Sequence, residues 1–249
     1  MMKHLKTLEG IRGLAAMYVL IHHARLALTQ SYKTGYVQQP ELYTWYNKVA
    51  VHILALFKFG NEAVLIFFVL SGFVIHLKHA TPSYNYRYFS WKDFLKKRII
   101  RIYPTLIASL LLCILIDFLI HLFYGISIQQ LFSKYTIASL TFNLLLIPDS
   151  EAWGVNAPIW SLKHEWFFYL TYPVLLCLSS LKKYYSLFLV ITLAISYFAG
   201  LKIPFIGAAA YTISIWFLGC ILAETYQMGY RISSIKYPMV LIFLYFILR

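Results

Sequence analysis

Two ionisable side chains in the apolar stretch that opens the chain have a spacing that could serve catalysis. Arg12 and His23 are eleven residues apart. In a helix, eleven residues make three turns plus about 20°, so both side chains share one face, about 16 Å apart along the axis. The His23 imidazole can take a proton from a hydroxyl near neutral pH, or act as a nucleophile. The Arg12 guanidinium can stabilise a developing oxyanion or neutralise Glu9, three residues before it.

A purely structural explanation of this polar stripe also stays open. A charged side chain at the centre of a membrane costs about 2.5–3.5 kcal/mol, so the stripe must face the interior of a helix bundle or a water-filled cavity. Neighbouring helices could satisfy it there without any chemistry. We favour a functional stripe, because ionisable groups inside a membrane are functional by default.

A second polar group interrupts the apolar sequence after residue 158. Ser161 and Glu165 are four residues apart, which places them on one face of a helix. The Glu165 carboxylate could activate a hydroxyl or bind a sugar, and Trp160 and Trp166 could stack on a sugar ring. The alternative is a pair of membrane-interface tryptophans beside a Lys163 side chain that extends toward the lipid headgroups.

Basic residues gather where the apolar stretch at 99–124 begins. Arg98 and Arg101 are three residues apart and share a helix face, and Lys96 and Lys97 come just before them. Guanidinium groups bind phosphate oxygens in a bidentate manner. The alternatives are anchoring at the cytoplasmic membrane surface and contact with anionic membrane lipids.

The composition indicates that a membrane protein positions these side chains. Of the 249 residues, 61% are hydrophobic and 12% are charged, whereas about 25% are charged in soluble domains. The net charge of +13 does not indicate binding to nucleic acid, because the basic residues lie mostly in loops beside apolar runs. The three cysteines have no metal-ligand spacing, so we expect no metal site.

The apolar runs are long and continuous, which predicts an all-α fold, a polytopic integral membrane helical bundle of about seven to eight transmembrane segments. We expect a single domain over residues 1–249. The predicted apolar segments are 10–30, 61–77, 99–124, 136–147, 158–181, 185–200, 203–223 and 237–248.

Loop charge predicts the orientation of these segments. The loop at 76–101 is strongly basic, so we expect this loop and the N-terminus to be cytoplasmic and the loop at 31–60 to lie outside. The segment at 136–147 is short for a span, and crossing there would place four basic residues outside. We therefore expect a re-entrant or half-length segment at 136–147.

Four stretches resemble, in order, the motifs of the acyltransferase family 3 membrane proteins. EGIRGLAAMYVLIHH at 9–23 is similar to the first helix of the family, which reads (D/E)-G-(L/I)-R with a histidine eleven residues after the arginine. GNEAVLIFFVLSGFVI at 60–75 resembles its second helix, and FLKKRIIRIYP at 94–104 resembles the basic stretch that opens its third. WSLKHEWFFYLTYP at 160–173 resembles its W-S-L-x-x-E-x-x-F-Y-L-x-x-P element.

The resemblance implies a membrane O-acyltransferase that moves an acyl group, above all acetyl, from acyl-CoA to a hydroxyl of a cell-surface or lipid-linked glycan. Acyl-CoA is then a co-substrate, with no bound cofactor, and the protein is a multi-pass protein of the bacterial inner membrane. The resemblance also implies catalysis by His23, Arg12 and Glu165, donor binding by Arg98, Arg101 and Lys97, and acceptor binding by Trp160 and Ser161.

Two other functions stay open. The same charges could line the pathway of a transporter or flippase for a glycan or lipid intermediate, although the sequence has no inverted repeat. The chain could also be an inactive or C-terminally incomplete family member, because the late S-Y-x-x-Y-L-x-H element of the family has no match before Arg249.

Overall fold

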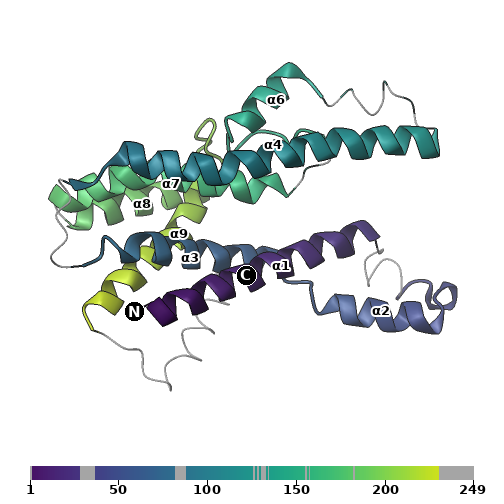
Figure 1. Ribbon diagram of the computed structural model, residues 1–249, viewed down its shortest axis with the longest axis horizontal. Helices are drawn as coiled ribbons and strands as arrows, with labels where there is room; N and C mark the ends of the chain where they lie inside the picture. The colour runs from purple at the N-terminus through teal and green to yellow at the C-terminus, as the bar shows by residue number, and fades with distance from the viewer. Residues whose placement is uncertain are drawn as a thin grey trace. The chain divides into compact units, whose positions relative to one another are not determined.

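The computed structural model is all-helical, with no strand in any part of the chain that it describes (Figure 1). It describes residues 2–28, 37–81, 88–125, 135–154, 158–181 and 183–229, with the single positions 127, 129, 133 and 156. The predicted all-α fold is confirmed. The chain divides into two compact units, the first formed by Met1–Pro82 and Ile215–Arg249 and the second by Ser83–Ser214.

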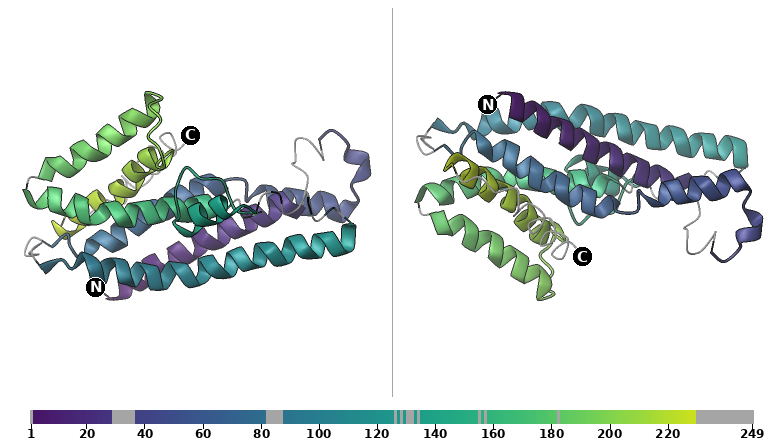
Figure 2. Two further views of the ribbon diagram at one scale, coloured as in Figure 1. Left: turned by 90° about the horizontal axis from the view of Figure 1, so that it is seen from above. Right: turned by 90° about the horizontal axis from the view of Figure 1, so that it is seen from below.

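The first unit is built on two long helices that pack along each other, α1 (Met2–Leu28) and α3 (Gly60–Leu77) (Figure 2). Between them come the short 3-10 helix η1 (Pro40–Leu42) and α2 (Trp45–Ala55). We predicted a loop over 31–60, and this is wrong over α2, because WYNKVAVHILA has too few turn-forming residues to break a helix.

The last helix, α9 (Ala209–Gln227), begins in the second unit and continues into the first from Ile215. It crosses α3 at a point where both helices carry glycine. A Cβ atom added at Gly72 would overlap the carbonyl oxygen of Trp216, and one added at Gly219 would overlap the carbonyl oxygen of Val69. The two backbones are therefore in direct contact, as small residues permit in membrane helices.

Polar contacts join α9 to the C-terminal half of α3. The Cys220 thiol donates to the carbonyl oxygen of Gly72 at 3.7 Å, and the Gln227 amide donates to the carbonyl oxygen of Leu77 at 3.1 Å. His76 Nε2 lies 3.3 Å from Glu224 Oε1. The crossing is thus held by backbone contact at its centre and by side-chain hydrogen bonds toward its end.

The second unit is organised by the 34-residue helix α4 (Trp91–Tyr124). The hydroxyl of Ser90 accepts from the amide of Asp93 and caps the start of α4, and Gly125 ends it in the left-handed conformation at φ 65°. Helix α7 (Ile159–Leu181) packs on α4 and on α8 (Lys183–Phe198). The short helix α6 (Ile137–Leu144) lies between α4 and α7 in the chain.

Within the described part of the chain, three helical stretches are long and apolar enough to cross a membrane: Trp45–Leu77, Trp91–Tyr124 and Ala209–Gln227. Helix α6 has eight residues, about 12 Å, which is less than half of the hydrocarbon thickness of a bilayer. A full crossing by α6 is therefore excluded, in line with the short segment predicted there. The count of seven to eight spans stays a prediction, and the segment at 237–248 lies outside the described residues.

Candidate active site

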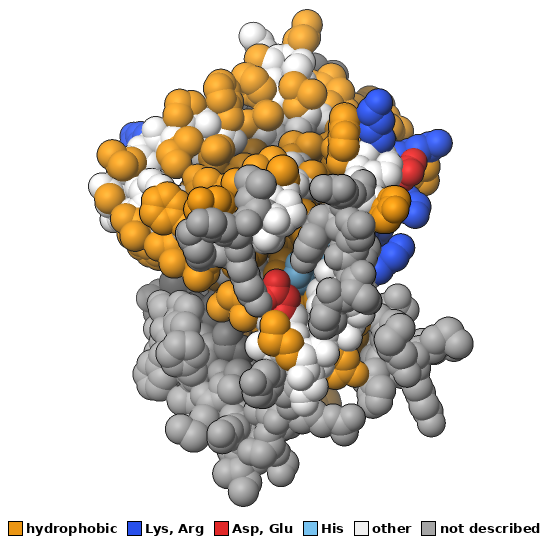
Figure 3. Space-filling model, turned by 90° about the vertical axis from the view of Figure 1, so that its left-hand side faces the viewer, with side chains coloured by type: hydrophobic (Ala, Val, Ile, Leu, Met, Phe, Trp, Pro, Cys, Tyr) orange, Lys and Arg blue, Asp and Glu red, His pale blue; other side chains and the backbone are white. Residues whose placement is uncertain are grey.

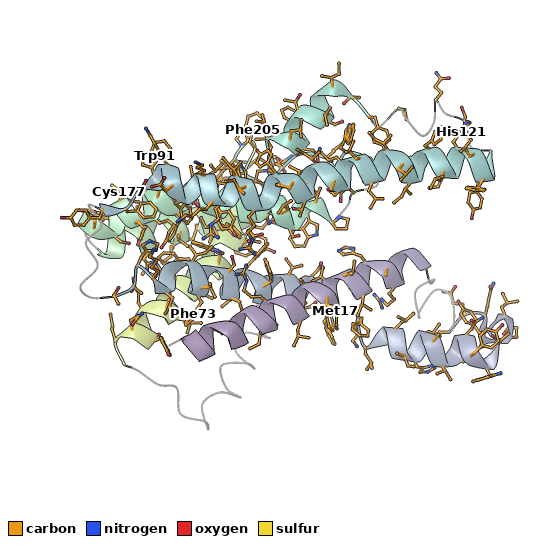
Figure 4. The ribbon with its side chains drawn as sticks, viewed as in Figure 1. Met17, Phe73, Trp91, His121, Cys177 and Phe205 are labelled. Atoms are coloured by element: carbon orange, nitrogen blue, oxygen red, sulfur yellow. The ribbon has the colours of Figure 1, made fainter. Side chains whose placement is uncertain are left out.

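Arg12 lies on the face of α1 that turns toward α3. Its side chain is only 8% exposed, and its guanidinium carbon lies 5.1 Å from the centre of the Phe67 ring. Met17, about 140° further round the helix and labelled in Figure 4, is exposed. Arg12 therefore points inward, as we predicted for the polar stripe. The predicted pairing with Glu9 involves a side chain outside the described residues.

Near the C-terminal end of the polar stripe, side chains of α1 form hydrogen bonds with the linker that joins α2 to α3. The Tyr18 hydroxyl donates to the carbonyl oxygen of Leu56 at 2.6 Å and accepts from the amide of Phe59 at 3.3 Å. His22 Nδ1 lies 2.7 Å from the carbonyl oxygen of Phe57. These contacts fix the first histidine of the pair against the backbone of residues 56–59.

The second histidine, His23, has a different environment. It is partly exposed, and its imidazole meets the His22 ring edge-on with 5.4 Å between centroids. Its nitrogens have no hydrogen-bond partner among the described residues. The structure therefore leaves His23, the predicted catalytic residue, free to meet a ligand but does not orient it.

In the second unit, a tyrosine joins two of the predicted site residues. Glu165 is 8% exposed, and its carboxylate accepts a hydrogen bond from the hydroxyl of Tyr169, one turn later on α7. The guanidinium carbon of Arg98, on α4, lies 4.9 Å from the centre of the same Tyr169 ring. Arg98 on α4 and Glu165 on α7 therefore contact the same side chain, that of Tyr169.

The guanidinium of Arg98 is held by aromatic rings rather than by a carboxylate. It lies 5.0 Å from the centre of Phe94 as well, and the Phe94 and Tyr169 rings meet at 89° with 6.2 Å between centroids. Cation–π contact binds the flat face of a guanidinium and leaves the N–H groups at its edge for other acceptors. Among the described residues, its Nε has no hydrogen-bond partner.

The other basic residues predicted to bind the donor lie at the surface. Lys97 and Arg101 are exposed on α4. Figure 3 shows Lys and Arg side chains gathered at one edge of the face that it draws. Arg98 therefore differs from its neighbours, because it alone of the predicted donor-binding residues is packed against rings.

Trp160 and Ser161, the predicted acceptor residues, lie in the first turn of α7. Trp160 is half-buried, with its ring 5.3 Å from the His164 ring, and the Ser161 hydroxyl donates to the carbonyl oxygen of Pro158 at 3.1 Å. The second predicted sugar-stacking residue, Trp166, is buried against Tyr103. Trp160 is thus the better placed of the two tryptophans to meet a ligand.

Lys163 does not extend toward headgroups, so that alternative is wrong for this side chain. Lys163 is 1% exposed, and its ammonium donates to the carbonyl oxygen and hydroxyl of Ser150, both at 2.8 Å, and to the carbonyl oxygen of Glu151 at 3.2 Å. The Asn143 amide also donates to the Glu151 carbonyl, at 2.8 Å. Lys163 therefore fixes the loop that leads into α7.

Asp117 lies four residues before His121 on α4 and has a partner outside that helix. Asp117 is buried and accepts a hydrogen bond from the Tyr135 hydroxyl. Burial and this hydrogen bond raise the pKa of Tyr135. A Cβ atom at Gly154, where φ is +67°, would overlap the Tyr135 phenol ring. Asp117 therefore holds Tyr135 in a tightly packed contact.

Arg12 and His23 belong to the first unit, and the other six predicted site residues belong to the second. The prediction missed Tyr169, although it lies four residues after Glu165 and within the same motif. That spacing places the two side chains on one helix face, so the sequence could have predicted that Tyr169 contacts Glu165.

Replacing Tyr169 by phenylalanine tests what its hydroxyl does. The ring that faces Arg98 is kept, while the hydrogen bond to Glu165 is lost. Hydrogen bonds to charged groups contribute about 1.5–3 kcal/mol, so we expect kcat for acyl transfer to fall about 10- to 100-fold with KM for acyl-CoA nearly unchanged. Steady-state kinetics in membranes measure both constants. A comparable rise in KM for acyl-CoA would show that the hydroxyl serves the donor site instead.

The fold and these clusters define an integral membrane protein with buried, hydrogen-bonded ionisable groups. The chain belongs to the acyltransferase family, because the family model described as an acyltransferase domain matches residues 5–248. This confirms the resemblance seen in the sequence. The acyltransferase MdmB of Streptomyces mycarofaciens is 29% identical over 178 residues, which cover 68% of this chain and 38% of that protein. The chain thus spans less than two-fifths of this curated relative, and no solved structure matches it.

Proposed function

We propose that this protein is a membrane O-acyltransferase that moves an acyl group, specifically acetyl, from acyl-CoA to a hydroxyl of a cell-surface or lipid-linked glycan. Membership of the acyltransferase family and the apolar spans support the reaction class and the membrane location. The basic loop at 76–101 supports a cytoplasmic N-terminus in a bacterial inner membrane. A cytoplasmic donor and an acceptor exposed on the other side would explain why the enzyme lies within the membrane.

The observation that carries the proposal is the arrangement of Arg98, Tyr169 and Glu165. A guanidinium held by two ring faces offers its edge to phosphate oxygens, which acyl-CoA carries. The Glu165 carboxylate is largely buried. It accepts a hydrogen bond from the hydroxyl of Tyr169, the residue whose ring faces Arg98. An anion-binding group and an oriented carboxylate are what a donor with phosphates and an acceptor with hydroxyls require.

The proposed roles follow from the chemistry of thioesters. The acceptor oxygen attacks the thioester carbonyl, its proton leaves, and the carbon–sulfur bond breaks to release CoA. His23 serves this transfer as acid–base group or as acyl carrier, and Arg12 stabilises the oxyanion that forms on the carbonyl oxygen. Glu165 activates or orients the acceptor hydroxyl, and Trp160 and Ser161 bind the acceptor. Arg98, with Lys97 and Arg101, binds the donor phosphates.

Labelled acetyl-CoA offered to membranes that contain the chain, with a total glycan extract, tests the proposal. We expect label on glycan hydroxyls with the native chain, and a KM for acetyl-CoA about 10- to 100-fold higher in Arg98→Ala, since one charge-assisted contact contributes about 1.5–3 kcal/mol. Lys92→Ala is the matched control, because it removes an exposed positive charge from the same end of α4. Absence of label from the native chain at good expression would contradict the proposal. Equal effects of the two variants would contradict the role of Arg98.

A further inference from the structure

The two ring nitrogens of His22 have different environments. Nδ1 lies 2.7 Å from the carbonyl oxygen of Phe57. A carbonyl oxygen only accepts hydrogen bonds, so Nδ1 carries the hydrogen, and in the neutral imidazole the lone pair then resides on Nε2. Among the described residues Nε2 has no hydrogen-bond partner. The backbone therefore fixes His22 in the tautomer that a general base needs.

The carbonyl that orients His22 is itself held in place. The Tyr18 hydroxyl binds the peptide groups on both sides of it, at Leu56 and Phe59, and the Tyr18 ring packs on Phe57 with 5.0 Å between centroids. On its other side the imidazole touches Gly60, where an added Cβ atom would lie 2.8 Å from Nδ1 and still closer to two ring carbons. The ring thus occupies a cradle that only glycine leaves open.

Such an arrangement is more than a helix contact requires. A hydrogen bond between α1 and the linker needs only a donor, and Tyr18 already supplies one. A histidine whose Nδ1–H donates to an immobile oxygen presents Nε2 in one direction, which is how proteins orient the imidazoles that move protons. His23, whose ring meets His22 at 5.4 Å, has no such orienting contact in the described part of the chain.

We infer that His22 is the base that takes the acceptor proton in the acyl transfer, the acid–base role given above to His23; the inference rests on the proposed function. Nε2 of His22 accepts the proton of the acceptor hydroxyl while the oxygen forms its bond to the acyl carbon. The carbon–sulfur bond then breaks, and the proton passes from Nε2 to the sulfur of the departing CoA. Protons and bonds balance with no further reactant, and the histidine returns to its starting tautomer.

His22→Asn separates the base from the hydrogen bond. The asparagine amide can donate to the Phe57 carbonyl in place of Nδ1–H, but it has no basic nitrogen. We expect His22→Asn to keep the melting temperature of the native chain while kcat falls at least 100-fold and the limb of the pH–rate profile that reports the base disappears. His52→Asn is the matched control, because it makes the same substitution at an exposed histidine whose Nδ1 also lies 2.7 Å from a backbone carbonyl oxygen, and it should change neither kcat nor the pH–rate profile.

The outcomes distinguish this inference from the proposed function. A native chain that transfers no label contradicts both. A native chain that transfers label, with His22→Asn within threefold of it, overturns only the inference and leaves His22 a structural contact. If His22→Asn fails to fold, His22→Ala is assayed with added imidazole: a rate that rises at least tenfold supports the base, and an unchanged rate overturns it. Gly60→Ala, which displaces the ring without changing charge, should lower kcat about tenfold.

Discussion

Replacement of Glu165 by glutamine is expected to lower kcat for acyl transfer about 100- to 10,000-fold, the range that general acid–base groups contribute. Glutamine keeps the size of the side chain and an oxygen that can accept from Tyr169, so only the charge and the basicity are lost. The Arg98 contact with Tyr169 stays intact, and KM for acyl-CoA should change little. Single-turnover transfer of labelled acetyl in membranes would measure the loss directly.

Glu41→Gln is the control for this variant, because Glu41 is an exposed carboxylate on η1 and should be replaceable without effect. A Glu165→Gln enzyme that keeps more than a tenth of native kcat would show that the Glu165 carboxylate is not the acid–base group. If KM for the glycan rises while kcat is kept, Glu165 binds the acceptor rather than activating it.

The second large effect is expected on stability, at the crossing of α3 and α9. Gly219→Ala would place a methyl group onto the carbonyl oxygen of Val69 and within 2.7 Å of the amide nitrogen of Phe73. Both are backbone atoms, so no side chain can turn away, and the helices must separate. Overpacking costs about 1–3 kcal/mol and occasionally more, and we expect a value at the upper end, with Gly72→Ala behaving alike. Thermal melting in detergent would show the loss as a shift of several degrees.

Gly13→Ala provides the matched comparison, because it makes the same substitution in a helix interior where no described atom beyond the helix's own backbone lies within 4 Å of the new methyl group. It should be neutral or stabilise by up to about 1 kcal/mol, the difference in helix propensity between the two residues. A Gly219→Ala chain as stable as Gly13→Ala would show that α3 and α9 do not meet backbone to backbone.

Much of the fold was predictable from the long apolar runs. A segment that spans the hydrocarbon core of a membrane must satisfy its own backbone hydrogen bonds, and a helix does this. The crossing of α3 and α9 at Gly72 could not be placed from the sequence. The partner of Gly72, Gly219, was not found, because one glycine inside an apolar helix carries no sign of which helix it touches. Helix α2 was missed for another reason: its lysine and its histidine are typical of loops, although helices expose such side chains readily.

Of the candidate site, residue types were predictable and partners were not. Spacing put Arg12 on the inner face of α1, where the structure places it. Spacing could not show that His22, rather than His23, is held by a backbone carbonyl 35 residues later in the chain. Nor could it show that Arg98 would meet Tyr169 rather than a carboxylate, because that contact depends on how α4 and α7 pack.

The buried ammonium of Lys163 also bears on how the chain enters the membrane. Alone in lipid, a helix that carries Lys163, His164 and Glu165 in its second turn would be a poor substrate for the translocon. The oxygens that accept from Lys163 belong to Ser150 and Glu151, which leave the ribosome before it. The acceptors are thus already synthesised when the charge arrives. We expect helix α7 to insert together with α6 and the loop that holds Ser150 and Glu151, and deletion of residues 145–154 should leave α7 on the ribosomal side of the membrane.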